Sequence, residues 1–461
     1  MQEEDKKSGV IKWVVVGVVI LLLLALAVFL LLRFAKDSPL AVTIGGVLPF
    51  GELAPEIPGG NSSGTTDNTN TDPDTTFAPD AREPLFRQLT EEQIAGATTV
   101  LRDGKTFVRY VLRKNGNIFE VDTTTWTTRQ LTITTIPQIH EAYFANSGNS
   151  VVLRYLKQDR ATAGDAIKTY LGDIILPFDM ASTSDAVGEI RGKYLQDNIS
   201  AVSISADGTK LLYFIPNTDG VVGFVQNLNS LLDPKEVLRS SFGEWLPQLF
   251  NDGTILLATK PSANIPGFSY LYNPVDKSMT RIVREKNGLT VLGENTKKNV
   301  LFGENLNGNS VIGIYNQKGF VLDEGLVNHE SPIPLTTLPE KCVWGQKSIQ
   351  LYCGAFSKKD KVSVPDDWYQ GFVSFEDLFW MVGADNQEIK LLGDPQKEVS
   401  RSFDTYMPFI DTEDKFLFFT DKNTDFLWSM RIVQPTTDEG ESSLPPPTPE
   451  EAGDAAGSQT N

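Results

Sequence analysis

The chain has 461 residues, 40% of them hydrophobic, so it is long enough for two or three ordinary domains or for one large repeat domain with extensions. Its 59 acidic residues outnumber its 41 basic residues, which gives a formal net charge of −18 at pH 7. A surface of this charge repels phosphate backbones, so we expect no nucleic-acid partner.

Near the N-terminus, residues 14–32 contain no charged or strongly polar side chain. As an α-helix this run extends about 30 Å, the thickness of one bilayer core. Trp13 and Arg33 lie where the two membrane interfaces are expected. We therefore predict one transmembrane helix over residues 13–34, with the lipid bilayer as its partner. The alternative is a cleaved signal peptide, but the run is longer than a typical apolar signal core and no small-x-small site follows it.

Residues 1–12 form a short polar segment that we predict to be cytoplasmic. Basic residues stand at both ends of the helix, so the positive-inside rule gives only a weak bias. The shortness of this segment, the stalk-like composition after the helix and the pair of cysteines all favour a single-pass protein of the cytoplasmic membrane, with its C-terminal domain outside.

Two further segments lack the composition of a folded domain. Residues 35–84 are predicted to be a flexible linker, because from residue 51 onward they consist mainly of Gly, Pro, Ser, Thr, Asn and Asp. Such a coil spans roughly 30 Å on average. Residues 434–461 carry six acids and no Lys or Arg, and are predicted to be a disordered acidic tail.

A short pattern recurs from residue 85 onward, in which a polar turn is followed by an alternating, mostly apolar strand. The clearest copy is ISADGTKLLYFI at residues 204–215. A second hairpin follows each copy, and four short strands per period of about 40–60 residues is the size of a β-propeller blade. The remaining copies are at residues 100–112, 143–156, 249–260, 293–305, 343–356 and 409–420.

We therefore predict an all-β fold, a β-propeller over residues 85–433. Seven blades are favoured, with six to eight as the range, because the fifth copy is weak and the sixth unit is long. Arg-Gln-Leu-Thr at residues 87–90 repeats at residues 129–132, where it would form the outer strand of the first blade. The last unit lacks an outer strand, so residues 85–90 are predicted to supply it and to close the ring.

The repeats resemble the WD40-like, TolB-type propeller repeats of bacterial envelope proteins. The residues that carry this resemblance are S-x-D-G-x-x-L-x-Y at 205–213 and looser copies at 251–257 and 411–418. The resemblance implies a ring of sheets that serves as an interaction platform for varied ligands.

Cys342 and Cys353 bracket a predicted hairpin whose turn lies at residues 345–348. Residues opposite each other in a non-hydrogen-bonded pair lie within disulfide reach, so a structural disulfide is expected in an exported domain. Two buried free thiols or a reactive pair are the alternatives. A C-x₂-C metal site is excluded by the spacing.

Two other stretches are candidate sites. Asp421 to Asp425 match the first three ligand positions of a calcium loop, but Phe426 and Ile432 replace the glycine and glutamate that such a loop needs, so an ordinary hairpin turn is favoured. The second stretch, in the sixth unit, contains the aromatic residues Trp368, Tyr369 and Phe372. Exposed aromatic rings can anchor a partner or stack on sugars. The alternative is that these rings simply cover a blade edge.

No catalytic, metal or cofactor motif is recognisable, and the two histidines, His140 and His329, lie far apart in sequence. We therefore expect a non-enzymatic, membrane-tethered binding or scaffold module for proteins or cell-envelope polymers. The alternative is a carbohydrate-active enzyme that uses paired carboxylates in the propeller funnel, because such acids can be distant in sequence.

Overall fold

The computed structural model describes residues 83–159, 164–177, 187–229, 233–296, 299–321, 327–357, 362–384 and 388–432, all within one compact unit, Asp80–Asn461. The predicted transmembrane helix, nearly all of the linker and the acidic tail lie outside the described residues. Among the described residues, no helix combines the length and the apolar character needed to cross a bilayer.

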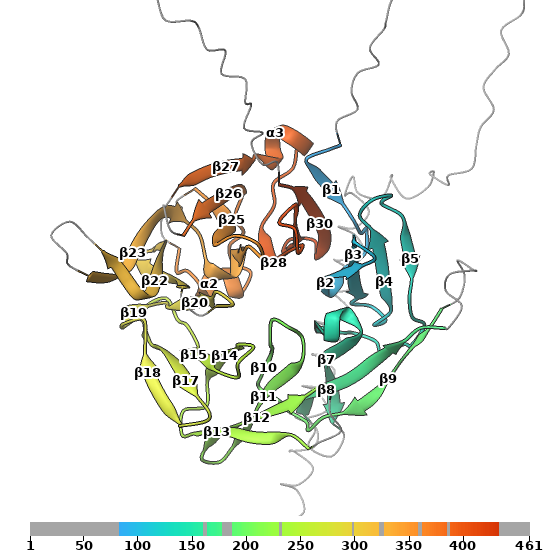
Figure 1. Cartoon of the computed structure of the whole chain (residues 1–461), viewed down its shortest axis with the longest axis horizontal. Helices are drawn as coiled ribbons and strands as arrows, with labels where there is room; N and C mark the ends of the chain where they lie inside the picture. The colour runs from blue at the N-terminus through green and yellow to red at the C-terminus, as the bar shows by residue number, and fades with distance from the viewer. Residues whose placement is uncertain are drawn as a thin grey trace, which may run out of the picture. The chain divides into compact units, whose positions relative to one another are not determined.

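Seven four-stranded antiparallel sheets are arranged as the blades of a ring, which confirms the predicted β-propeller and its favoured blade count (Figure 1). In order from the centre outwards, blade 1 contains β2 (Ile94–Arg102), β3 (Lys105–Leu112), β4 (Ile118–Asp122) and β5 (Thr128–Gln130); blade 2 contains β6 (Glu141–Ala145), β7 (Ser150–Asp159), β8 (Gly164–Ile175) and β9 (Glu189–Tyr194); blade 3 contains β10 (Ala201–Ile204), β11 (Lys210–Asn217), β12 (Gly220–Asn227) and β13 (Lys235–Ser240).

The second half of the ring follows the same plan. Blade 4 contains β14 (Trp245–Leu249), β15 (Ile255–Thr259), β17 (Ser269–Asn273) and β18 (Ser278–Arg281); blade 5 contains β20 (Thr290–Gly293), β21 (Asn299–Leu306), β22 (Asn309–Val321) and β23 (Val327–Thr336); blade 6 contains β24 (Cys342–Trp344), β25 (Gln350–Phe356), β26 (Asp377–Gly383) and β27 (Ile389–Gly393); blade 7 contains β28 (Thr405–Ile410), β29 (Phe416–Asp421), β30 (Phe426–Arg431) and β1 (Phe86–Gln88).

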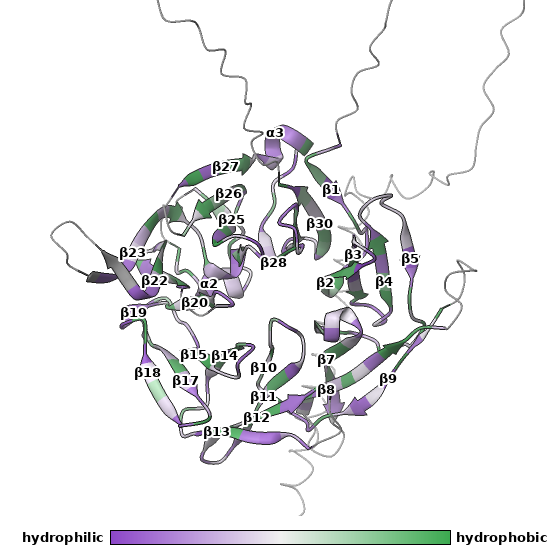
Figure 2. Ribbon diagram, viewed as in Figure 1, coloured by the Kyte–Doolittle hydropathy of each residue, from purple (hydrophilic) through white to green (hydrophobic). Residues whose placement is uncertain are grey.

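All seven predicted turn-plus-strand copies are the inner hairpins of these sheets, including the weak fifth copy, which forms β20 and β21. The middle strands are apolar on both faces because each blade is covered by its two neighbours. In β11, for example, the consecutive residues Leu211 to Phe214 are all buried. Figure 2 shows this apolar interior, with polar positions concentrated in rim strands such as β5 and β13.

The ring is closed by β1, which pairs with β30 as the outer strand of blade 7, as predicted. The repeated Arg-Gln-Leu-Thr sequence makes the same contacts in both blades. The side-chain amides of Gln88 and Gln130 donate to the carbonyls of Thr90 and Thr132 at 2.7 and 2.8 Å. The two threonine hydroxyls accept from the backbone N–H groups of the neighbouring strands, Leu427 at 3.1 Å and Ile118 at 3.0 Å.

The ring has two different faces, because neighbouring strands in every sheet run in opposite directions. We call the face with the turns between first and second strands the proximal face. The chain enters the propeller there, where the carbonyl of Leu85 accepts from the N–H of Arg431 at 2.9 Å, and leaves there at Ile432. The opposite, distal face carries the turns between second and third strands and the connections from one blade to the next.

A long connection in blade 6, between β25 and β26, folds over the distal side of the ring. It contains the short helix α2 (Asp366–Tyr369), which Figure 1 places inside the ring. The carboxylate of Asp366 accepts from Ser262 and from the N–H of Ala263 in blade 4, both at 3.0 Å. Smaller elements between the blades are η2 (Asn146–Gly148), β16 (Pro266–Gly267), which pairs with β19 (Lys286–Asn287), η4 (Pro339–Lys341) and α3 (Pro395–Val399).

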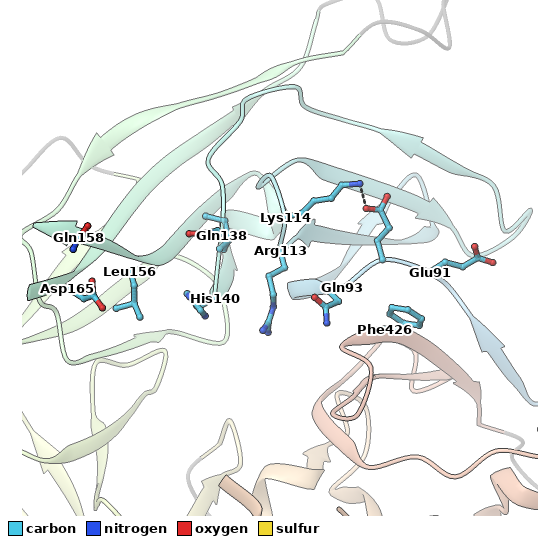
Figure 3. Close-up of a pocket in the computed structure, with 12 residues that line it drawn as sticks. Glu91, Gln93, Arg113, Lys114, Gln138, His140, Leu156, Gln158, Asp165 and Phe426 are labelled. Carbon is cyan, nitrogen blue, oxygen red and sulfur yellow. Dashed lines mark ion pairs between the residues drawn. The ribbon is translucent and has the colours of Figure 1, made fainter. Parts of the chain in front are cut away.

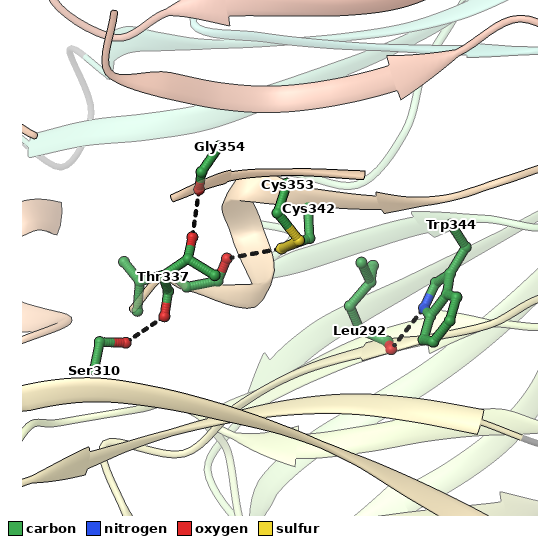
Figure 4. Close-up of a disulfide and its surroundings, with 8 residues drawn as sticks. Leu292, Ser310, Thr337, Cys342, Trp344, Cys353 and Gly354 are labelled. Carbon is green, nitrogen blue, oxygen red and sulfur yellow. Dashed lines mark hydrogen bonds between the residues drawn. A yellow bond between two sulfur atoms is a disulfide. The ribbon is translucent and has the colours of Figure 1, made fainter. Parts of the chain in front are cut away.

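The predicted disulfide joins Cys342 in β24 to Cys353 in β25, which stand directly opposite each other with Cα atoms 4.1 Å apart (Figure 4). Both residues are buried in the core shared by blades 5 and 6. Nearby, the indole N–H of Trp344 donates to the carbonyl of Leu292 at 3.2 Å and links the first strands of these two blades. The bridge therefore reinforces the innermost hairpin of blade 6.

Replacing both cysteines with alanine is expected to lower the free energy of unfolding by about 2–3 kcal/mol, because a short loop loses its cross-link in the unfolded chain. Denaturant titration of the full chain checks this value. Alkylation of the unreduced, denatured protein followed by mass measurement should find no modified cysteine; two alkylated thiols would show that the bridge does not form.

Candidate functional site

The distal face carries a cavity of about 840 Å³ where blades 7, 1 and 2 meet (Figure 3). Its walls come from the segment after β1, the turn after β3, the segment before β6, the β7–β8 hairpin and the start of β30. We call it the distal groove, and it is lined by Glu91, Glu92, Gln93, Arg113, Lys114, Gln138, Ile139, His140, Leu156, Gln158, Asp165 and Phe426.

Backbone hydrogen bonds hold these separate loops together. The N–H of Ile139 donates to the carbonyl of Arg113, whose own N–H donates to the carbonyl of Gln93, each at 2.9 Å. The N–H of Ile94 donates to the carbonyl of Asp425 in blade 7, also at 2.9 Å. The walls of the groove are thus tied to three rigid sheets, which favours a preformed site.

The groove presents charges of both signs, amides and some apolar surface. Lys114 pairs with Glu92, and Arg113 lies 3.4 Å from the carboxylate of Asp425. The leucine in the wall, Leu156, is 48% exposed. Such a lining matches a ligand with many hydrogen-bonding groups and some apolar faces, which is the chemistry of a polar peptide or a glycan.

Three tyrosines and two glutamates form a second group on the distal side, on the inner strands β6 and β28 and on η4 and α2. Tyr143 donates to Glu141 at 3.1 Å, and Glu141 also pairs with Arg154. In the other half of the group, the hydroxyl of Tyr369 in α2 donates to the carboxylate of Glu340 in η4. We call this set, together with Tyr406, the phenol–carboxylate group.

Electrostatics link the two halves of this group. Burial raises the pKa of Tyr406, and the negative charges of Glu141 and Glu340 raise it further. Burial also raises the pKa of Glu340, although the hydrogen bond from Tyr369 works in the opposite direction. The pKa of Tyr143 is raised by burial and by Glu141. These phenols therefore remain protonated hydrogen-bond donors at neutral pH.

The aromatic surface predicted from the sequence is only partly present. Trp368 is completely buried, so the expectation that its ring is exposed is wrong. Its indole N–H donates to Asp404 at 2.9 Å, and its ring lies 5.2 Å from the ammonium of Lys341, because α2 folds inwards. Tyr369 and Phe372 are 43% and 75% exposed and remain available on the surface.

The stretch from Asp421 to Asp425 forms a hairpin turn between β29 and β30. The carboxylate of Asp421 accepts from the N–H of Asp404 at 3.2 Å and from the hydroxyl of Thr424 at 2.9 Å. These hydrogen bonds close the turn and anchor the start of β28. Within the described ranges, no group of three or more His, Cys, Asp or Glu side chains has a metal-binding arrangement.

Sequence reasoning did not identify the distal groove or the phenol–carboxylate group. The groove residues come from five segments and those of the phenol–carboxylate group from four elements, and neither set shows a fixed spacing. The available signal was indirect: in a propeller, the segments before first strands and after second strands meet on one face, so His140, Gln93 and Arg113 can be placed together once the blades are numbered.

No family model matches this sequence, and no curated protein matches it. Among solved structures, the chain is similar to the tricorn protease at 11% identity and a TM-score of 0.44, covering 76% of this chain and 34% of that one. It is also similar to an oligogalacturonate lyase in complex with manganese (12%, TM-score 0.46, 76% and 93% covered) and to TolB from Acinetobacter baumannii (11%, TM-score 0.36, 73% and 79% covered).

The chain spans about a third of the length of the tricorn chain. At these identities and scores the similarities carry no functional argument, and the seven-bladed fold is established by the sheet topology itself.

Proposed function

We propose that this protein is a membrane-tethered, extracytoplasmic binding module whose distal groove holds a polar segment of an envelope protein or polymer. Residues 13–34 anchor the chain in the cytoplasmic membrane, and residues 35–84 connect the anchor to the propeller. The acidic character of the chain, with its net charge of −18, disfavours a nucleic-acid ligand.

One observation carries this proposal: the groove and both chain ends of the propeller are on opposite faces. The chain enters beside Arg431 and leaves at Ile432 on the proximal face, whereas the groove opens on the distal face. A tether attached in this way leaves the groove free to bind a ligand. A large pocket lined with polar groups on a rigid scaffold is also where a ligand is expected to bind in a folded domain.

A matched pair of substitutions tests the proposal. Leu156 lies in the groove and is 48% exposed, while Leu391, on the rim strand β27, is 44% exposed. The full chain with Leu156→Arg should lose its crosslinked envelope partners, because a long charged side chain fills the groove. The chain with Leu391→Arg should keep them. Equal capture by both variants would refute the groove as the binding site.

The location requires a separate measurement. Protease added to intact spheroplasts should cleave the propeller away from the membrane if the domain lies outside. Full protection until the membrane is opened would place the domain inside and would contradict the proposed topology.

A second candidate function is supported by the phenol–carboxylate group. The negative charges of Glu141 in β6 and Glu340 in η4 both raise the pKa of Tyr406, so two carboxylates from different parts of the ring act on one phenol. A pair of carboxylates is what most glycoside-cleaving enzymes use. Glycan turnover by the wild-type chain that disappears in Glu141→Gln and in Glu340→Gln would favour this enzyme over a binding module.

A further inference from the structure

On the proximal face, three arginines of blade 1 surround a single glutamate. Glu120 in β4 stands directly between Arg109 in β3 and Arg129 in β5 in the strand register. Arg109 donates to Glu120 at 2.8 Å, and Arg129 donates at 2.6 and 3.1 Å. Arg102, at the end of β2, donates at 3.0 Å. Both carboxylate oxygens are therefore fully used.

This cluster keeps an excess of positive charge. The carboxylate of Glu120 cannot neutralise three guanidinium groups, so the three arginines and the glutamate together carry a formal charge of +2. Asp122 also lines the adjacent cavity, but it interacts with Lys105, and the N–H of Thr124 donates to it at 2.7 Å. A local positive charge is unusual in a chain whose net charge is −18.

The cluster opens into a cavity of about 230 Å³ lined by Arg102, Phe107, Glu120, Asp122, Thr127 and Arg129. Arg109 and Glu120 are almost completely buried, whereas the side chains of Arg102 and Arg129 are 37% and 34% exposed. Each guanidinium has five N–H donors, and the hydrogen bonds to Glu120 use only part of them. The ring of Phe107 lies 4.0 Å from the Arg102 guanidinium and holds it in place.

We propose that this cavity is a binding site for a tetrahedral oxoanion, a phosphate group held between the guanidinium groups of Arg102 and Arg129. Planar guanidinium forks match two oxygens of a phosphate, and the buried Arg109–Glu120 pair fixes the fork positions beforehand. The cavity admits one phosphate group with a small substituent. The excess positive charge excludes a cation as the ligand.

The position of the cavity gives the phosphate two possible sources. Trp126, in the β4–β5 turn beside the cavity, lies 4.5 Å from the Arg87 guanidinium in β1, the strand by which the chain enters the propeller. The site is thus on the face to which the linker is joined. The phosphate can come from a soluble phosphomonoester or from the headgroup of an anionic phospholipid, and the chemistry at the two arginines is the same.

The first experiment measures binding of inorganic phosphate to the full chain in neutral detergent, with chloride used to keep the ionic strength constant. Calorimetry should show saturable binding with one phosphate per chain. Arg129→Gln should weaken it at least about tenfold, because a charged, bidentate contact is lost. Arg129→Lys, which keeps the charge but not the fork, should give an intermediate affinity.

The control is Arg239→Gln, which removes an exposed arginine that is paired with Glu236 in blade 3 and should leave phosphate binding unchanged. Unfolding curves without phosphate show whether each variant is folded. If phosphate binding is not saturable at constant ionic strength, or if folded Arg129→Gln binds as tightly as the wild type, the proposed site is wrong.

A second experiment distinguishes the two sources. Hydrogen exchange of the β4–β5 turn is compared in phosphatidylcholine vesicles with and without phosphatidylglycerol. Protection that needs phosphatidylglycerol and is lost in Arg129→Gln identifies a headgroup site. Protection by glycerol 1-phosphate alone, with no effect of the lipid, identifies a site for soluble phosphomonoesters. Neither outcome depends on the distal groove, so failure here leaves the proposed function untouched.

Discussion

Replacing Lys341 with methionine is expected to lower the free energy of unfolding by about 3–5 kcal/mol, because two buried carboxylates lose the buried cation that pairs with both of them. Lys341 is fully buried, and its ammonium lies 2.8 Å from Asp377 and also pairs with Asp404. Asp404 in turn accepts from the indole of Trp368. Without the ammonium, the two carboxylates are left without its charge in a site where the rings of Phe356, Trp368 and Phe375 lie close to the lysine position.

A matched control is Lys347→Met, because Lys347 pairs with Glu413 on the surface and its side chain is 56% exposed. That change should cost no more than about 1 kcal/mol. Urea titration followed by tryptophan fluorescence measures both variants. Equal effects of the two substitutions would show that the buried cluster contributes no more to the free energy of unfolding than a surface ion pair does.

The pH dependence of Lys341→Met gives an independent check. Burial already raises the pKa of Asp377, and Lys341 opposes this rise. Removing the lysine raises that pKa further. A carboxyl group whose pKa is higher in the folded state than in the unfolded state stabilises the fold most at pH values below its pKa in the unfolded chain. This stabilisation is lost as the pH rises through the pKa of the folded state. The destabilisation should therefore be smaller near pH 4 than at pH 7.

Replacing Phe86 with alanine is expected to lower the free energy of unfolding by about 3–5 kcal/mol. Phe86 is only 2% exposed, and its ring lies 5.3 Å from Phe379 and 5.8 Å from Phe403. The substitution removes the side chain that fixes β1 against blades 6 and 7. Thermal unfolding should begin with the detachment of β1, and deleting residues 84–90 should lower the transition temperature still further.

Phe372→Ala serves as the control, because that phenylalanine is 75% exposed and its loss should change stability by no more than about 0.5 kcal/mol. Hydrogen exchange of β30 separates local opening from global unfolding. If Phe86→Ala leaves the exchange of β30 and the unfolding transition unchanged, β1 does not close the ring.

Local sequence patterns were sufficient to predict the ring. Each inner hairpin is encoded by a polar turn and an apolar strand, and the repeated Arg-Gln-Leu-Thr identified the closing strand because the same four residues make the same contacts twice. The disulfide followed from the hairpin register. The register of β3, β4 and β5 also places Arg109, Glu120 and Arg129 side by side, so that cluster was within reach of sequence reasoning.

The burial of Trp368 was not predictable in the same way. The cation Lys341 precedes β24 and the partner Asp404 precedes β28, so they belong to different connections. No local sequence pattern indicates that a polar connection will fold inwards over this charged pair. The distal groove depends likewise on loops from three blades, whose contacts are set by how the sheets pack rather than by any spacing along the chain.

The pairing of β1 with β30 also determines when the ring can close during biosynthesis. Phe86 leaves the ribosome long before its partner Met430, because the seven blades' inner strands are all translated between them. During that interval the nascent chain has an unpaired N-terminal strand, and the later blades have no neighbour to close upon. A propeller with this order of assembly cannot close before β30 has been made, and a product truncated before β30 is left with open sheet edges that favour aggregation.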